Sequence, residues 1–328
     1  MDFLEKPELG TTTTKIYLKC IGSYRSAEKR ERMKKFCQAV KISAKKYDKR
    51  VPRLEFIEPT IPNEVSSKEC RDELQDVYEK KFAKKPQNSS DDDDDSVGET
   101  VYSYFKKIRR SKICGRCPIC GSSAGITELD HYLPKSKYPT LCVHPNNLIP
   151  ICSACNDKKK AKVSTPAEGM HLHLYFDRLP MTEVEDGDPY IEAFLYAELD
   201  ENFRIRFVVQ CPDSWDSSFS KRLEKHMEIF ELSERYEKAA YAEYAALIRK
   251  WRKHTPKQYD SSLSTDAREQ LEIRALQKVI DAQLVSTCDD LNTWQSALYR
   301  ALEGKEAELA AFLKAHEAEI LDAALRYN

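Results

Sequence analysis

The chain has 328 residues and a net charge of −1, with 53 Lys and Arg against 54 Asp and Glu. This balance gives no global basic character, so only local charge can point to nucleic acid. The sequence has no run of 18 apolar residues, which excludes a transmembrane helix. Its start does not resemble a secretory signal, and its 11 cysteines are therefore expected in a reduced cytoplasm.

The charges are distributed unevenly along the chain. Residues 13–53 hold 14 Lys and Arg against 3 Asp and Glu, and residues 101–163 hold 12 against 3. The remainder must be acidic, which suits a phosphate-binding face and a solvated or protein-facing back. The alternative for either basic stretch is a solvated helix face.

The N-terminal 84 residues are predicted to form a basic α+β region. Residues 1–10 are expected to be a loose arm. Met33, Phe36 and Val40 recur at helical spacing, and Ser66 with Glu69 forms a capping-box pattern. The predicted elements are strands at 15–21 and 53–57 and helices at 26–46 and 66–84.

An acidic, polar segment follows at residues 85–99. Five consecutive Asp residues at 91–95 repel one another, so this segment is predicted to be a disordered linker. A metal-binding or DNA-mimic role for the Asp run is the alternative. Residues 100–112 are then predicted to form an aromatic and basic helix.

Two Cys-x-x-Cys pairs, Cys117/Cys120 and Cys152/Cys155, bracket the central stretch of the chain. Four thiolates make a complete tetrahedral set for a structural Zn²⁺. Gly121 suits the turn of a zinc knuckle, because glycine tolerates positive φ. Cys114 lies three residues before Cys117, so a Cys114/Cys117 register is an alternative.

The segment between the two pairs carries the polar candidates. Residues 126–129 are predicted as a strand ending at Asp130 and His131, residues 147–151 as a returning strand, and residues 154–161 as a helix. Such a hairpin and helix can bring Asp130, His131 and Asn156 around one point. Histidine titrates near neutral pH, which suits a general base, and Asp and Asn oxygens suit Mg²⁺ or Mn²⁺.

The pattern D-H-x-x-P, N-L-x-P-x-C-x-x-C-N-x-x-K resembles the HNH endonucleases, the zinc-stapled branch of the ββα-metal fold. The resemblance covers roughly residues 114–177. It implies that His131 is the general base, that Asn147 steadies the loop and the histidine, and that Asp130 and Asn156 bind the catalytic metal. Lysines near the motif are predicted to contact nucleic acid; they are Lys135, Lys137, Lys158 and Lys159.

After this module, assigned to residues 100–180, the sequence predicts a hairpin and a helical bundle at 181–328. His171 and His173 alternate as on a strand and could line the site, although packing is the simpler interpretation. The hairpin is predicted from residues 190–199 and 203–210, and helices from 218 onward. Leu309, Leu313 and Ile320 could either dock a partner or close the bundle. The fold class is therefore α+β and mainly helical, with a central HNH module.

Three functions are compatible with these features: a metal-dependent HNH endonuclease, a non-catalytic zinc-stapled nucleic-acid-binding module, and an assembly subunit. The joint presence of Asp130, His131 and Asn156 favours the endonuclease, with DNA as substrate. The runs LDHYLPKSKYP and NLIPICSACNDKKK resemble the PtuB nuclease subunits of bacterial Septu-type and retron-associated anti-phage systems. That resemblance implies a cytoplasmic bacterial protein with an ATPase partner of the PtuA type. The chain itself has no P-loop sequence.

Overall fold

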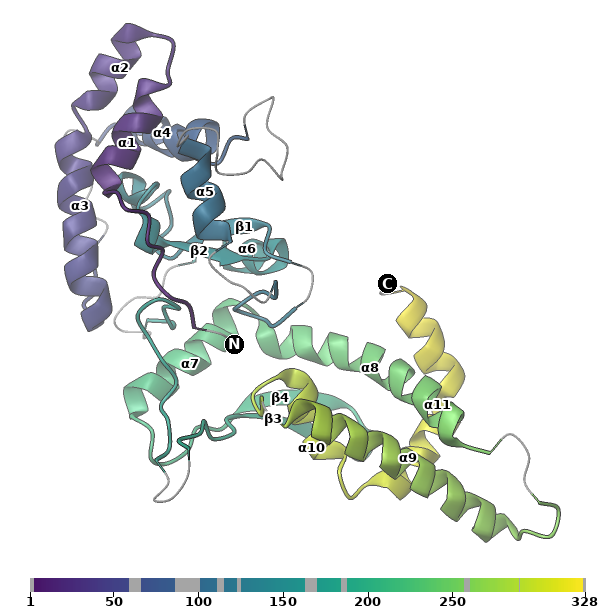
Figure 1. Cartoon of the computed structure of the whole chain (residues 1–328). Helices are drawn as coiled ribbons and strands as arrows, with labels where there is room; N and C mark the ends of the chain where they lie inside the picture. The colour runs from purple at the N-terminus through teal and green to yellow at the C-terminus, as the bar shows by residue number, and fades with distance from the viewer. Residues whose placement is uncertain are drawn as a thin grey trace. The chain divides into compact units, whose positions relative to one another are not determined.

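The computed structural model divides the chain into two compact units, Met1–Arg178 and Leu179–Asn328 (Figure 1). Cys114 and the Asp run at 91–95 lie outside the residues that the structure describes. Those residues are 3–58, 66–85, 101–110, 115–122, 125–162, 170–183, 188–256, 260–288 and 290–326. The chain is mainly helical with two small antiparallel sheets, which confirms the predicted α+β class.

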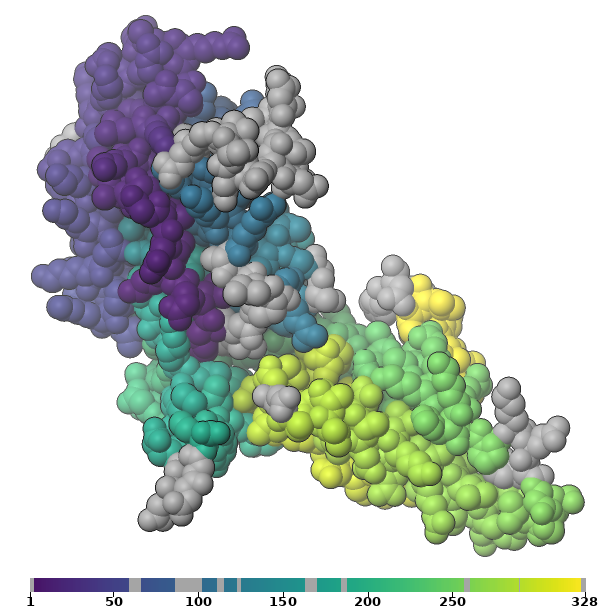
Figure 2. All heavy atoms as spheres, in the orientation of Figure 1, coloured from purple at the N-terminus to yellow at the C-terminus, as the bar shows by residue number. Residues whose placement is uncertain are grey.

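The first unit begins with an arm that lies on its surface (Figure 2) and is tied down at Leu4, whose N–H donates to the carbonyl of Leu174 at 2.8 Å. The helices after the arm depart from the predicted elements. They are α1 (Thr13–Gly22), α2 (Ala27–Lys34), α3 (Cys37–Arg50) and the 3₁₀ turn η1 (Val51–Arg53).

Two predicted strands in this region are wrong. Residues 15–21 belong to helix α1, which begins where the Thr12 hydroxyl accepts from the N–H of Lys15. Ile16, Tyr17 and Cys20 are all fully buried, a spacing that fits one helical face and cannot fit one face of a strand. Residues 53–57 do not extend either, because Leu54 adopts φ 59° and turns the chain after η1.

The other N-terminal predictions need smaller corrections. The basic helix predicted at 26–46 is split between α2 and α3 around Lys35 and Phe36. The capping residue of α4 (Lys68–Val77) is Ser67, whose hydroxyl accepts from the N–H of Cys70, and not Ser66. A π-helical turn, η3 (Tyr78–Phe82), continues α4, and α5 (Val101–Arg109) follows.

The ββα module itself is close to the prediction. Strand β1 (Glu128–His131) pairs antiparallel with β2 (Leu148–Ile151), and the short turns η4 (Pro139–Leu141) and η5 (Pro145–Asn147) lie between them. Helix α6 (Ser153–Lys159) follows β2 directly. In the register, His131 faces Leu148 and Asp130 faces Ile149.

One apolar core joins this module to the N-terminal helices. Buried residues of the helices before the module pack in the same cluster as residues of the hairpin. Representative members are Ile16, Met33, Leu74, Phe105 and Leu148. The basic N-terminal region and the module therefore fold as parts of one unit, and their positions relative to each other are held by apolar burial.

The second unit contains the predicted hairpin and helical bundle. Strands β3 (Leu195–Leu199) and β4 (Ile205–Val209) pair antiparallel. The left-handed backbone of Glu231, with φ 51°, separates α7 from α8. The helices are α7 (Ser217–Ile229), α8 (Leu232–His254), α9 (Thr265–Thr287), α10 (Trp294–Leu302) and α11 (Glu306–Arg326).

The last helix contributes to the core of this unit. Leu309, Leu313 and Ile320 are 0%, 1% and 8% exposed. This burial matches the alternative in which the stripe closes the chain's own bundle, and it leaves these three side chains covered. Within the described ranges, none of the helices has the length and apolar character that crossing a bilayer requires.

Candidate active site

The four cysteines of the two Cys-x-x-Cys pairs come together and are all buried. The Sγ atoms of Cys117 and Cys155 are 3.7 Å apart, those of Cys120 and Cys152 are 3.8 Å apart, and all four lie within 4.8 Å of one another. A tetrahedral Zn²⁺ with Zn–S bonds of about 2.3 Å requires sulfur atoms about 3.8 Å apart. The cluster therefore has the dimensions of a structural zinc site.

Backbone hydrogen bonds shape the cluster. The N–H of Gly121 donates to the carbonyl of Cys117 at 2.8 Å, and Gly121 has φ 70°, which glycine adopts without strain. The N–H of Cys152 approaches the Cys117 sulfur at 3.5 Å. Hydrogen bonding with the Cys117 thiol lowers the pKa of Cys120. Among the residues that the structure describes, the first pair in the cluster is Cys117/Cys120.

The ring of His131 is fixed by one hydrogen bond. Its Nε2 lies 2.9 Å from the carbonyl oxygen of Cys142. A carbonyl can only accept, so Nε2 carries the proton, and in a neutral ring Nδ1 is then the unprotonated nitrogen. Nδ1 makes no hydrogen bond to another described residue. His131 therefore presents the nitrogen that a general base requires.

Burial keeps this ring neutral. His131 is 7% exposed and packs edge-on against Tyr78, with ring centroids 4.5 Å apart. Burial lowers its pKa from the ordinary 6.5 to about 3, and the positive charges of Lys135 and Lys159 act in the same direction. The imidazole is consequently unprotonated across the physiological pH range, although its intrinsic basicity in the unliganded protein is weak.

Asp130 is held by a buried lysine. The Nζ of Lys159 lies 3.1 and 2.9 Å from the two carboxylate oxygens of Asp130 and donates to the carbonyl of His131 at 2.6 Å. Lys159 is 0% exposed and Asp130 is 5% exposed. Burial raises the pKa of Asp130, and the neighbouring ammonium opposes that rise. The ion pair joins helix α6 to strand β1 beside the candidate base.

Asn147 fastens the loop between the strands. Its Oδ1 accepts from the N–H of Leu133 at 2.8 Å, and its Nδ2 donates to the carbonyls of Leu133 and Leu141 at 3.1 and 3.4 Å. Asn147 is 0% exposed. These contacts hold the segment that runs on to Cys142, whose carbonyl orients His131. The geometry is that of a positioning residue.

The oxygen donors for a catalytic metal are few. Asn156 is half-buried on α6, three residues before Lys159, so both side chains leave the same face of the helix. Long helical side chains lean toward the N-terminus, which brings the Lys159 ammonium toward the level of Asn156. Asp130 and Asn156 offer the hard oxygen ligands that Mg²⁺ and Mn²⁺ prefer. Both oxygens of Asp130 already contact an ammonium, but a carboxylate has about four acceptor positions and can share them.

The predicted nucleic-acid-binding lysines differ in position. Lys137 is exposed and Lys158 half-buried. Lys135 forms an ion pair with Glu79 at 2.8 Å. For Lys159 the sequence predicts a nucleic-acid contact, whereas the structure buries it completely against Asp130. Lys159 is therefore part of the site's interior.

His171 and His173 are buried packing residues and do not present an oriented ring nitrogen as His131 does. They are 3% and 1% exposed, and both rings pack on Tyr132 with centroid distances of 4.4 and 4.3 Å. The Nε2 of His173 also forms a hydrogen bond with the Tyr47 hydroxyl at 2.8 Å. Packing, the simpler interpretation, describes both residues.

Two contributors to the site were not expected from the sequence. Tyr78 lies against the His131 ring and donates from its hydroxyl to the carbonyl of Leu129 at 3.2 Å. Cys142 supplies the carbonyl that orients the histidine. A backbone carbonyl carries no side-chain signature, and Tyr78 lies 53 positions before His131 in the chain, so neither motif nor spacing could reveal them.

This arrangement, a zinc-sized cysteine cluster beneath a hairpin that presents an oriented histidine, agrees with the family comparison. The model of the HNH endonuclease family matches residues 117–162, and this stretch is an HNH endonuclease domain.

The chain is similar to Protein ea31 of Escherichia phage lambda. The two are 27% identical over 196 residues, which span 58% of this chain and 62% of ea31. The similarity thus covers less than two thirds of that relative. No solved structure matches the chain.

Proposed function

We propose that the protein is a metal-dependent endonuclease that hydrolyses phosphodiester bonds in DNA. The observation that carries the proposal is the oriented, neutral ring of His131 inside an HNH domain. With Nε2 bound to the Cys142 carbonyl, Nδ1 accepts a proton from water, the water oxygen bonds to the phosphorus, and the bond from the phosphorus to the 3′-oxygen breaks. A divalent ion on Asp130 and Asn156 would neutralise charge on the scissile phosphate and the leaving 3′-oxygen.

The chain's own residues provide the remaining parts of this mechanism. Asn147 keeps the loop that leads to the Cys142 carbonyl in place. Lys159, on α6, holds the carboxylate of Asp130 in β1 and supplies positive charge next to this candidate metal ligand. An anionic phosphate near His131 would favour its protonated form, which raises its basicity when substrate is bound.

The test is incubation of the purified protein with plasmid DNA. We expect relaxed and linear products with Mg²⁺ or Mn²⁺ and none when both ions are omitted. Intact plasmid under every metal condition, together with unimpaired DNA binding, would instead support the non-catalytic zinc-stapled module. The low exposure and low pKa of His131 are the observations that favour that second candidate.

The proposal extends to a role as the cytoplasmic nuclease subunit of a bacterial anti-phage complex with a PtuA-type ATPase. Its support is the resemblance of two sequence runs, the longer being NLIPICSACNDKKK, and the lack of a P-loop in this chain. The similarity to a phage protein gives this extension no added weight. Affinity purification from the native host tests it: a stoichiometric ATPase is expected, and its absence contradicts the extension without affecting the nuclease proposal.

A further inference from the structure

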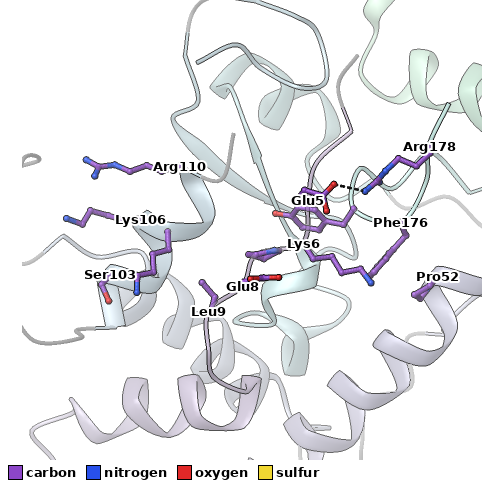
Figure 3. Close-up of a pocket in the computed structure, with 13 residues that line it drawn as sticks. Glu5, Lys6, Glu8, Leu9, Pro52, Ser103, Lys106, Arg110, Phe176 and Arg178 are labelled. Carbon is purple, nitrogen blue, oxygen red and sulfur yellow. Dashed lines mark ion pairs between the residues drawn. The ribbon is translucent and has the colours of Figure 1, made fainter. Parts of the chain in front are cut away.

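A large cleft in the first unit is separate from the residues assigned to catalysis. Its volume is about 1080 Å³, slightly above the range of roughly 300–1,000 Å³ for small-molecule sites. The N-terminal arm, helix α5 and the segment after the HNH domain form its walls. The polar and aromatic lining includes Lys6, Lys106, Lys107, Arg110, Phe176 and Arg178 (Figure 3).

The lining is positively charged. Among the described residues, it contains five Lys and Arg side chains and two carboxylates, Glu5 and Glu8. Glu5 is paired with Arg178 at 3.5 Å, and this exposed pair contributes little energy. Helix α5 presents Lys106 and Lys107, and Arg110 follows its last residue directly; the Arg110 N–H donates to the carbonyl of Lys106 at 2.9 Å, so these two residues are one helical turn apart. The charge complements a polyanion.

An aromatic ring accompanies these charges. Phe176 is half-buried, lines the cleft and carries the Lys6 ammonium 4.8 Å from its ring centroid. Cationic grooves with aromatic faces are how proteins hold single-stranded nucleic acid, because an unpaired base can stack and a paired base cannot.

The walls of the cleft are fixed to the HNH domain. The Tyr175 hydroxyl donates to the carbonyl of Leu148 at 2.7 Å, and Leu148 is the strand partner of His131. The N-terminal arm is tied to the same segment by the bond from the Leu4 N–H to the Leu174 carbonyl, and it is also held by burial of Leu9. The cleft is thus preorganised, and a strand bound in it is held at a defined position relative to the candidate base.

From these observations we infer that the cleft binds a single-stranded nucleic-acid segment through its phosphates. The inference rests on the proposed nuclease function. It assigns the positioning of the substrate to a surface whose residues lie outside the HNH motif. The single strand lies against α5 and Phe176, and the scissile bond lies elsewhere on the same substrate.

The experiment measures binding without catalysis. A fluorescein-labelled single-stranded oligonucleotide is titrated with full-length protein in buffer without Mg²⁺ or Mn²⁺, and fluorescence anisotropy is recorded over a salt series. The test variant combines K106Q, K107Q and R110Q. The control variant combines K238Q, R249Q and K253Q. These three substitutions are at exposed positions of α8 and remove the same number of positive charges.

Each lost phosphate contact lowers the salt slope for a single strand by about 0.7. We expect the α5 variant to lose a slope of about 2 and roughly 50-fold in affinity at about 0.15 M salt, and the α8 variant to bind like the wild type. Additional F176A in the α5 background should weaken binding further, because stacking is removed.

Four results would overturn the inference: an unchanged slope in the α5 variant, equal losses in both variants, tighter binding of a duplex with the same α5 dependence, or displacement of the oligonucleotide by polyglutamate at equal charge concentration. The last two results would assign the cleft to duplex nucleic acid and to an acidic protein, respectively. If binding follows the expectation but plasmid cleavage fails, the nuclease proposal is wrong and the cleft assignment is retained as a binding site.

Discussion

Replacing Lys159 with methionine removes the cation that holds Asp130. The ammonium lies 2.9 and 3.1 Å from the Asp130 oxygens, and the two residues are 0% and 5% exposed. K159M keeps a similar side-chain volume but leaves a buried carboxylate without its partner, a change that costs about 3–5 kcal/mol. In D130N/K159M, the buried charge is absent, and most of this loss should be recovered.

Hydrogen-exchange mass spectrometry of peptides from residues 125–162 reports the loss locally, because it follows the opening of this module in the full-length protein. A loss of about 3–5 kcal/mol corresponds to exchange roughly 10²- to 10⁴-fold faster in K159M. Added Mn²⁺ should slow exchange more in K159M than in the wild type, because a divalent ion can replace the missing cation. K137M, at an exposed lysine, should change the opening energy by less than about 0.5 kcal/mol. Equal exchange in K159M and K137M would refute the buried-pair argument.

Three further predictions concern the metals and the pH dependence. Metal analysis should find about one zinc per chain, and chelation should unfold the region 117–160, because binding and folding of such a site are one equilibrium; a metal-free protein with the region intact would contradict the zinc assignment. N156A should lower the cleavage rate in a way that raised Mg²⁺ or Mn²⁺ partly restores, as for a lost ligand; a residual rate that ignores metal concentration would make Asn156 purely structural. The pKa of His131 falls from 6.5 to about 3 on folding, so below pH 6.5 the unfolded chain binds a proton that the folded chain does not. Stability is therefore lost as the pH falls from 6.5 toward 3. Between pH 8 and pH 5 the wild type should lose about 2 kcal/mol more than H131Q in urea titrations; parallel pH profiles would refute the depressed pKa.

The sequence predicted the HNH module well because the constraints there are local. Four cysteines at knuckle spacing, with Gly121 where a positive φ occurs, define the four-cysteine cluster without reference to distant residues. The hairpin of β1 and β2 follows from the alternation of short apolar segments with prolines and asparagines. His131 and Asn147 both lie in this module, where each makes buried hydrogen bonds to the loop between the strands.

The N-terminal region was predicted less well. Its apolar segments are short, and a short apolar segment fits the periodicity of a helix as well as that of a strand. Residues 15–21 are rich in apolar and β-branched side chains and were assigned to a strand, yet burial of Ile16, Tyr17 and Cys20 on one side makes the helix the better solution. Packing against residues distant in the chain selects the helix, and a segment of seven residues carries no information about that packing.

The role of Lys159 required the fold. In the sequence it is one of three consecutive lysines at 158–160, and a lysine run most simply predicts a solvated or phosphate-binding surface. Only the packing of α6 against β1 places the middle lysine inside, against Asp130. The neighbouring residues show how strongly helix phase controls the fate of a charge, since Lys158 is half-buried and Lys160 exposed.

Cleavage of plasmid DNA by H131A in the presence of Mg²⁺ tests the central claim most directly, with anisotropy of labelled DNA measured on the same preparation. A general base acts in the transition state and contributes little to ground-state affinity. The expected result is a cleavage rate lower by roughly 10²–10⁴ with DNA affinity unchanged, while H171Q, at a buried histidine outside the site, cleaves like the wild type. Wild-type cleavage by H131A would contradict the assignment of His131 and with it the mechanism.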